Sequence, residues 1–163
     1  MSVITNFTDW VTLAETKDYL RIDAGITESD TEITVMINAA CELIQTYTEH
    51  YFKPQARTYY FTHGCARVYA TPITSVTLPV EATDYSIEVK QMYSIYTPVL
   101  TTLKSITFDI GYTDTDQIKD IFKYAVWETV KLWFYGSESE TVMKGYVPSS
   151  VLAILAGERR FIL

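Results

Sequence analysis

Apolar side chains recur every three or four positions in several stretches of the chain, and this spacing predicts amphipathic helices. The longest predicted helix covers residues 29–52, where Ser29 and Glu32 form a capping box at its start. Its apolar face consists of Ile33, Ile37, Ala40, Ile44, Tyr47 and Tyr51. Pro54 lacks a backbone N–H and cannot continue a helix, so we expect this helix to end before it.

A second long helix is predicted over residues 116–135 by the same spacing. Asp114 or Asp116 is expected to cap its start, and Gly136 is the natural residue to end it. The side chains expected on its buried face are Ile118, Ile121, Phe122, Ala125, Thr129, Leu132 and Trp133. The two long helices together predict a helical bundle.

Two shorter helices are predicted beside the long ones. Thr12 and Glu15 form a capping box that opens the first, and Pro148 opens the last. The inward side chains of the first are expected to be Leu13, Thr16, Tyr19 and Leu20. Those of the last are expected to be Val151, Leu152 and Leu155.

Residues 57–110 change from helical spacing to short Thr-, Val-, Ile- and Tyr-rich pieces with partial alternation, which is typical of β-strands. The strand-like pieces are "RTYYFTH", "ARVYA", "ITSVTL", "DYSIEV" and "SITFDIGY". The stretch "KQMYSIYTPVLTTLK" remains ambiguous. The prediction is a mainly α fold with an inserted β region (α+β) in a single domain over residues 1–163. An N-terminal arm would occupy residues 1–12 and a tail residues 157–163.

Charge and composition narrow the possible functions. The 163 residues carry a formal net charge of −7 and have no basic stripe, so tight electrostatic binding of nucleic acid is disfavoured. An acidic surface instead suits a protein that lets DNA slide past it. Thirteen tyrosines fit protein interfaces, although half-buried strands favour tyrosine equally. The chain shows neither a signal peptide nor an apolar run of membrane length, which predicts a soluble intracellular protein without membrane contact.

The soft metal ligands are too few and too scattered to predict a metal centre. Cys41, His50, His63 and Cys65 match no zinc spacing, and both cysteines are expected to be free thiols. A nucleophilic Cys–His pair is conceivable but has no further support. We therefore predict no metal and no cofactor.

The acidic residues near "TDTD" could form a paired carboxylate for acid–base chemistry or for a divalent cation. Asp114 and Asp116 directly precede an apolar-periodic run, where a helix start requires such residues in any case. Asp109 is expected to be a charge at a strand edge or turn. No catalytic residue is predicted, and a small acidic metal-dependent hydrolase using these residues is kept only as a rival.

The order of the elements resembles that of the head–tail connector (adaptor) proteins of long-tailed bacteriophages and prophages. The markers are the helix end "YLRID", the Gly111–Tyr112 turn into the third helix, and its end at "WFY". The resemblance extends from about Val11 to Arg160.

The resemblance implies a non-enzymatic virion protein of the neck, assembled in the host cytoplasm. It implies a ring of twelve copies beneath the portal protein, which extends the DNA channel without binding DNA specifically and offers a docking face to a stopper or tail protein. A stopper or tail-completion protein and an interaction module of unknown partner remain as alternatives.

Two sets of residues follow as site hypotheses. The apolar tail with its two arginines would dock into the portal, the alternative being that it folds back over its own core. Its residues are Arg159, Arg160, Phe161, Ile162 and Leu163. Acidic residues would face the channel, the candidates being Glu28, Asp30, Glu32, Glu42 and Glu49.

Overall fold

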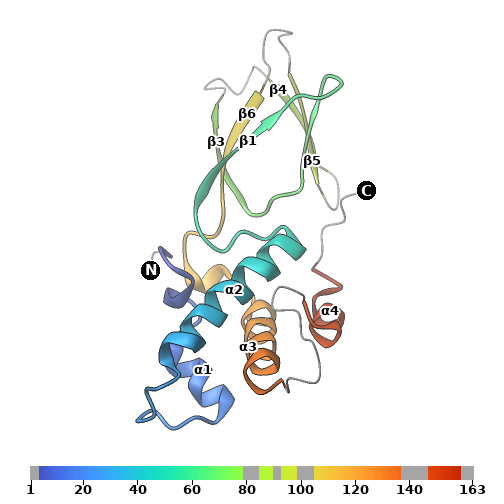
Figure 1. The fold of residues 1–163 in the computed structure, drawn as a ribbon. Helices are drawn as coiled ribbons and strands as arrows, with labels where there is room; N and C mark the ends of the chain where they lie inside the picture. Colours follow the sequence, from blue (N-terminus) through green and yellow to red (C-terminus); the bar gives the residue numbers. More distant parts are fainter. Residues whose placement is uncertain (1–3, 79–84, 90–92, 99–104, 137–146, 159–163) are drawn as a thin grey trace. The chain divides into compact units, whose positions relative to one another are not determined.

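The computed structural model describes residues 4–78, 85–89, 93–98, 105–136 and 147–158 (Figure 1). The chain has an α+β fold, as the sequence predicted, and divides into two compact units. The described residues within Met1–Thr48 and Thr113–Arg159 form the helical unit, and those between positions 49 and 112 form the sheet unit. The prediction of a single adaptor domain over residues 1–163 stays a prediction.

The helical unit consists of four α-helices and two short 3-10 turns among its described residues. In chain order these are η1 (Phe7–Asp9), α1 (Leu13–Leu20), α2 (Asp30–Thr48), η3 (Thr115–Gln117), α3 (Asp120–Tyr135) and α4 (Ser149–Leu155). Helix α3 packs against α2 and α4, and α1 and η1 both contact α2. None of these described helices is long and apolar enough to cross a membrane.

Apolar stripes at helical spacing form the core of this unit. The fully buried residues of α2 include Ile33, Ile37, Ala40 and Ile44, as predicted. Those of α3 include Phe122, Ala125, Val126, Thr129 and Val130. The predicted N-terminal arm also packs, because Ile4, Phe7, Trp10 and Val11 are buried.

The ends of the helices agree only partly with the sequence prediction. The capping box of α1 is confirmed: the Glu15 backbone N–H donates to Thr12 Oγ1 at 3.3 Å, and Glu15 Oε2 accepts the Thr12 N–H at 3.2 Å. Asp114 instead caps η3, and α3 begins at Asp120 rather than at residue 116. Ile118 has extended backbone between the two, which interrupts a continuous helix.

Two further expectations for the long helices are wrong. Leu132 was expected to be buried but is 36% exposed, although it lies about 20° around α3 from the fully buried Ala125. Helix α2 ends at Thr48 rather than near residue 52. Glu49 has a left-handed backbone (φ 58°), so the helix stops well before Pro54.

The sheet unit contains six described strands, and these confirm the predicted β insertion. They are β1 (Gln55–Tyr60), β2 (Ala66–Val68), β3 (Ile73–Leu78), β4 (Tyr85–Val89), β5 (Ser94–Pro98) and β6 (Ser105–Ile110). They form two three-stranded antiparallel sheets with the strand orders β1–β6–β3 and β2–β5–β4. The ambiguous stretch "KQMYSIYTPVLTTLK" contains β5.

The core of the sheet unit draws on both sheets. Burial alternates strictly along β6, so that Ile106, Phe108 and Ile110 point inward. Ala66 and Val68 of β2 and Tyr96 of β5 belong to the same buried cluster. The Tyr96 and Phe108 rings lie 4.5 Å apart between centroids and link the two sheets.

The opposite face of β6 carries Asp109, which was expected at a strand edge or turn. That expectation is wrong, because β6 is the central strand of its sheet. The Asp109 carboxylate accepts a 2.6 Å hydrogen bond from the Ser75 hydroxyl of the neighbouring strand β3.

The two ends of the sheet unit are tied together. The Tyr112 backbone N–H donates to the Tyr51 carbonyl at 3.0 Å. Gly111 has a positive φ of 105°, and a Cβ there would lie 2.1 Å from the Lys53 carbonyl oxygen. Only glycine permits this close approach of the two chain segments.

Candidate functional site

The residues considered for metal or nucleophilic chemistry do not form a site. Cys41 is fully buried in α2, in the helical unit, whereas His50, His63 and Cys65 belong to the sheet unit. His50 Nδ1 lies 3.1 Å from the Tyr112 hydroxyl. Among the described residues, no three His, Cys, Asp or Glu side chains gather where they could hold a metal ion.

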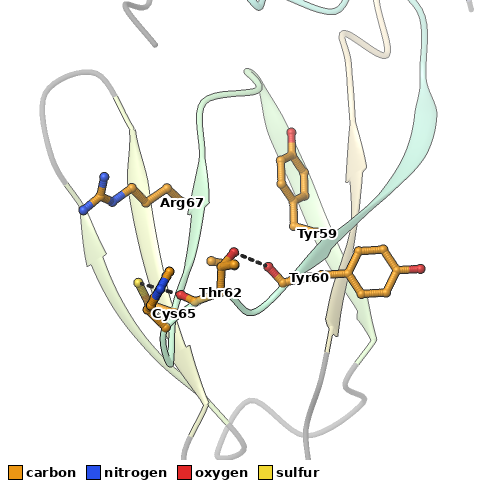
Figure 2. Close-up of a pocket in the computed structure, with 7 residues that line it drawn as sticks. Tyr59, Tyr60, Thr62, Cys65 and Arg67 are labelled. Atoms are coloured by element: carbon orange, nitrogen blue, oxygen red, sulfur yellow. Dashed lines mark hydrogen bonds between the residues drawn. The ribbon is translucent and has the colours of Figure 1, made fainter. Parts of the chain in front are cut away.

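Figure 2 shows the hollow at the turn between β1 and β2, which contains two of these residues. Its lining consists of Tyr59, Tyr60, Thr62, His63, Cys65, Ala66 and Arg67. Thr62 and Cys65 exchange backbone hydrogen bonds across the turn, at 2.8 and 3.2 Å. The labelled Tyr60 and Arg67 side chains point in opposite directions, so the hollow lacks the convergent polar groups of a reactive site (Figure 2).

The acidic residues of the rival hydrolase hypothesis also lie in structural roles. Asp109 belongs to the sheet unit and pairs with Ser75. The Asp114 carboxylate accepts the Asp116 backbone N–H at 3.2 Å, which is the cap of η3.

The clearest open surface of the helical unit is a mostly apolar groove along α2, which we call the α2 groove. Its lining residues are Glu28, Thr31, Glu32, Val35, Met36, Ala39, Glu42, Leu43, Thr46 and Trp133. The helical part of this stripe is about 22 Å long at 1.5 Å per residue. Val35 is 62% exposed at its centre, and the largely buried Trp133 comes from α3. The groove is mostly apolar and open, as surfaces that bind other proteins are.

Sequence reasoning missed this second apolar face of α2. Val35, Ala39 and Leu43 are four residues apart, and this spacing places them on one side of a helix. The signal was therefore present in the sequence. It was overlooked because the more apolar stripe that includes Ile33 and Ile37 accounted for the helix by itself.

Three of the five candidate channel acids lie on this groove. Glu28, Glu32 and Glu42 line it, and no cation of the described residues forms an ion pair with them. The other two candidates, Asp30 and Glu49, do not line the α2 groove. Whether any of the five faces a channel stays a prediction.

Asp30 instead belongs to a buried ion pair that shapes the start of the groove. Lys17 is only 4% exposed, and its Nζ lies 2.8 Å from Asp30 Oδ1. The same ammonium donates to the carbonyls of Ala24, at 3.3 Å, and Ile26, at 2.5 Å. The three hydrogen bonds that this ammonium donates hold the loop that leads from α1 into α2, and this loop carries Glu28.

Glu49 lies in the sheet unit, beyond the end of α2. Its carboxylate is 3.6 Å from the Arg57 guanidinium and accepts a hydrogen bond from the Tyr51 hydroxyl at 3.1 Å. Burial raises the pKa of Glu49 above its ordinary value, and the charge of Arg57 opposes this shift.

A second surface of the helical unit joins the ends of α1 and α3, and we call it the Arg21 face. It is lined by Tyr19, Leu20, Arg21, Lys131 and Tyr135. Arg21 has a left-handed backbone (φ 58°) at the C-cap of α1 and is exposed. The Tyr135 hydroxyl donates to the Leu20 carbonyl at 2.6 Å, although the residue remains 58% exposed.

A partly buried hydrogen bond fixes the aromatic side of this face. The Tyr19 hydroxyl donates to Glu128, which also accepts from Lys131 Nζ at 3.3 Å. Burial and the neighbouring Glu128 raise the pKa of Tyr19 well above its ordinary value. The Arg21 face is therefore an aromatic surface whose tyrosines are held in place by hydrogen bonds, and it carries two cations.

The predicted portal-docking residues 159–163 lie outside the described part of the chain. Their role stays a prediction.

Comparison with known proteins shows that the chain is similar in fold to solved structures. No family model and no curated protein sequence matches the chain. A chain from the neck of an empty gene transfer agent particle, computed with C6 symmetry, is similar with a TM-score of 0.70 and 15% identity. A chain from the virion of a native gene transfer agent particle has a TM-score of 0.68 and 16% identity. A chain from the neck of the native particle, computed with C12 symmetry, has a TM-score of 0.67 and 16% identity.

Each of these matches covers 99% of this chain and 95% of the other. The likeness therefore extends over both units. At this level of identity it establishes a shared fold.

Proposed function

We propose that the protein is a structural component of the neck of a phage-like particle. The observation that carries this proposal is the fold match over 99% of the chain to chains from the necks of gene transfer agent particles. A second observation supports it, because the α2 groove is a mostly apolar open surface of the kind that protein partners cover. The protein acts by contact with other proteins and carries out no reaction.

Within the neck, we assign the protein the role of head–tail adaptor. Twelve copies form a ring beneath the portal, the ring extends the DNA channel, and its far side receives a stopper or tail protein. The similar neck chains were computed with C6 and with C12 symmetry, and a twelvefold ring contains both symmetries. The ring is assembled in the host cytoplasm and remains in the virion.

The tail provides the contact with the portal in this proposal. Phe161, Ile162 and Leu163 fill a portal groove, and Arg159 and Arg160 pair with acids on its rim. An acidic protein around the channel avoids retaining DNA by its phosphates.

Electron microscopy of the protein mixed with purified portal rings tests the proposal. We expect a second ring stacked coaxially on each portal ring. Failure to associate with portal rings would overturn the adaptor role, and association only with a preformed portal–adaptor complex would identify a stopper instead.

A matched variant tests the role of the tail. Removing residues 159–163 retains Glu158, which pairs with Lys119 at 2.8 Å, and therefore leaves the described ion pairs of the helical unit intact. The shortened protein should unfold at the same temperature as the full chain and yet no longer bind portal rings. Loss of the folded state would show that the tail packs on its own core.

A further inference from the structure

We propose that the α2 groove of one copy binds the Arg21 face of a second copy, so that copies of the helical unit join head to tail. This inference deepens the proposed ring, because it assigns the surfaces by which neighbouring copies touch. It rests on the proposed function only for the number of copies in the assembly.

The α2 groove exposes apolar surface that folding of the chain leaves uncovered. Val35 is 62% exposed and Leu43 is half-buried, beside the largely buried Met36 and Trp133. Apolar area in contact with water costs free energy, and covering it with a partner recovers that free energy. The groove is therefore suited to a partner with an apolar or aromatic side chain at its centre.

The charges of the two surfaces are complementary. The groove has three carboxylates, those of Glu28, Glu32 and Glu42, which pair with no cation of the described residues. The Arg21 face presents Arg21, for which the described residues offer no carboxylate partner, and Lys131, which keeps its contact with Glu128. In a contact between the two, arginine and lysine meet carboxylates around an apolar centre.

The Arg21 face also provides an aromatic anchor. Tyr135 is 58% exposed, while its hydroxyl is held by the Leu20 carbonyl. Tyrosine and arginine are the residues most enriched at the energetic centre of protein interfaces. A tyrosine already fixed in place loses little side-chain entropy when it enters the groove beside Val35 and Leu43.

Helix geometry places the two surfaces on different sides of the unit. Lys131 and Tyr135 are four positions apart, about 40° around α3, and so share one side. Trp133 lies about 200° from Lys131, on the opposite side, where it lines the α2 groove. Two unlike, complementary surfaces on opposite sides of one unit give a heterologous contact that repeats from copy to copy.

This assignment competes with the hypothesis that Glu28, Glu32 and Glu42 face the channel. A channel filled with water and DNA would leave the apolar part of the groove uncovered, whereas a neighbouring copy covers it. The contact therefore accounts for the carboxylates and the apolar residues together.

Cysteine cross-linking tests the contact directly. In a Cys65→Ser background, which removes the partly exposed thiol and retains the buried Cys41, we would introduce A39C and G136C together. Ala39 lines the groove between Val35 and Leu43, and Gly136 directly follows Tyr135, so both cysteines flank the contact and leave its anchor residues in place. Treatment of the concentrated protein with a short bis-maleimide should give a ladder of dimers, trimers and larger products on a denaturing gel. Each single variant should remain monomeric, because a head-to-tail contact joins position 39 of one copy to position 136 of the next.

Charge reversal provides the specificity control. Arg21→Glu in the double-cysteine protein should lower the yield of cross-linked product about tenfold, because it places like charges across the contact. Adding Glu32→Arg should restore much of the yield. Arg67→Glu reverses an exposed arginine of the sheet unit and should change nothing. Circular dichroism of each variant verifies that it is folded.

Several results would overturn the inference. These are the absence of a ladder, a ladder that survives Arg21→Glu unchanged, or dimers formed by A39C alone, which would indicate a symmetric contact. The outcome is separable from the neck assignment. A ladder without portal binding would refute only the proposed function, and a ring stacked on the portal without a ladder would refute only this contact.

Discussion

The helical unit and the sheet unit close their cores by different means. The sheet unit places aromatic side chains between two sheets, with the Phe108 ring in contact with Tyr96. The helical unit packs aliphatic stripes and also buries a charged group, Lys17, whose ammonium bonds to Asp30 and two carbonyls. Apolar packing holds the core of the sheet unit, whereas the helical unit depends in addition on the hydrogen-bonded ammonium of Lys17.

This difference has a consequence for surfaces. The sheet unit uses both of its inner sheet faces to make one core. In the helical unit, α2 buries one face against its neighbours and leaves a second apolar face open as the α2 groove. A helix can offer two apolar stripes separated by polar positions, and this unit uses one for folding and one for contact.

The largest predicted effect is on the aromatic core of the sheet unit. Phe108→Ala should cost about 3–5 kcal/mol, because it removes a fully buried ring that links the two sheets. Urea unfolding followed by near-ultraviolet circular dichroism measures the loss. Thr97→Ala, an exposed position next to Tyr96 on β5, is the control and should cost less than about 1 kcal/mol. Equal effects of the two changes would contradict the sandwiched core.

A smaller effect is expected for the buried charge of the helical unit. Lys17→Met should cost about 2–3 kcal/mol, because Asp30 loses its cation and the Ala24 and Ile26 carbonyls lose their donor. This loss of stability is smaller than for a fully buried ion pair that loses one partner, because the Asp30 side chain is 28% exposed and keeps some hydration. The helical signal at 222 nm during thermal unfolding reports the change.

Lys119→Met provides the matched control for the buried lysine. Lys119 pairs with Glu158 at the same 2.8 Å distance, but its side chain is 60% exposed. Exposed pairs contribute about 0–1 kcal/mol. If the two lysine variants lost the same stability, burial of Lys17 would not be what makes its pair important.

The smallest effect is a pH dependence of opposite sign in the two units. Burial raises the pKa of Glu15 in the helical unit, but hydrogen bonds from Lys123 and Thr12 outweigh burial, so its pKa lies below the ordinary 4.5. In the sheet unit, burial raises the pKa of Glu49 above 4.5 against the charge of Arg57. Glu15 therefore contributes stability above pH 4.5 that is lost as the pH falls, whereas that of Glu49 is present below pH 4.5 and lost as the pH rises.

Unfolding free energies measured across this range check the two signs. Glu15→Gln should flatten the loss of stability below pH 4.5, and Glu49→Gln should flatten the decline above it. A change of the same sign for both variants would contradict the opposite environments of the two carboxylates.

The two units also differ in how far the sequence predicts them. Helix periodicity is local, so the buried stripe of α2 and the capping box at Thr12 were predicted correctly. Helix ends depended on backbone conformation that the pattern does not encode, such as the left-handed Glu49. Sheet pairing is long-range: β1 pairs with β6 across most of the unit, and no local pattern identifies β6 as the central strand.

The candidate site was predictable only in part. The sequence singled out Glu28, Glu32 and Glu42 by charge, and they do lie together on one groove. It also grouped Asp30 with them, although folding pairs this residue with Lys17, which is thirteen positions earlier in the chain. The Arg21 face was not anticipated, because Arg21 and Tyr135 come together only when α1 and α3 meet.

The backbone hydrogen bond from Tyr112 to the Tyr51 carbonyl closes a segment that is continuous in the sequence, whereas the helical unit is interrupted by it. On the ribosome, the strands are therefore synthesised in full before α3 and α4 emerge. Until then α1 and α2 lack the helix that covers their core stripe, so the nascent chain exposes that stripe for the whole time needed to translate the insertion. The order of synthesis thus completes the strands first and leaves the first two helices without their covering helix until translation reaches α3.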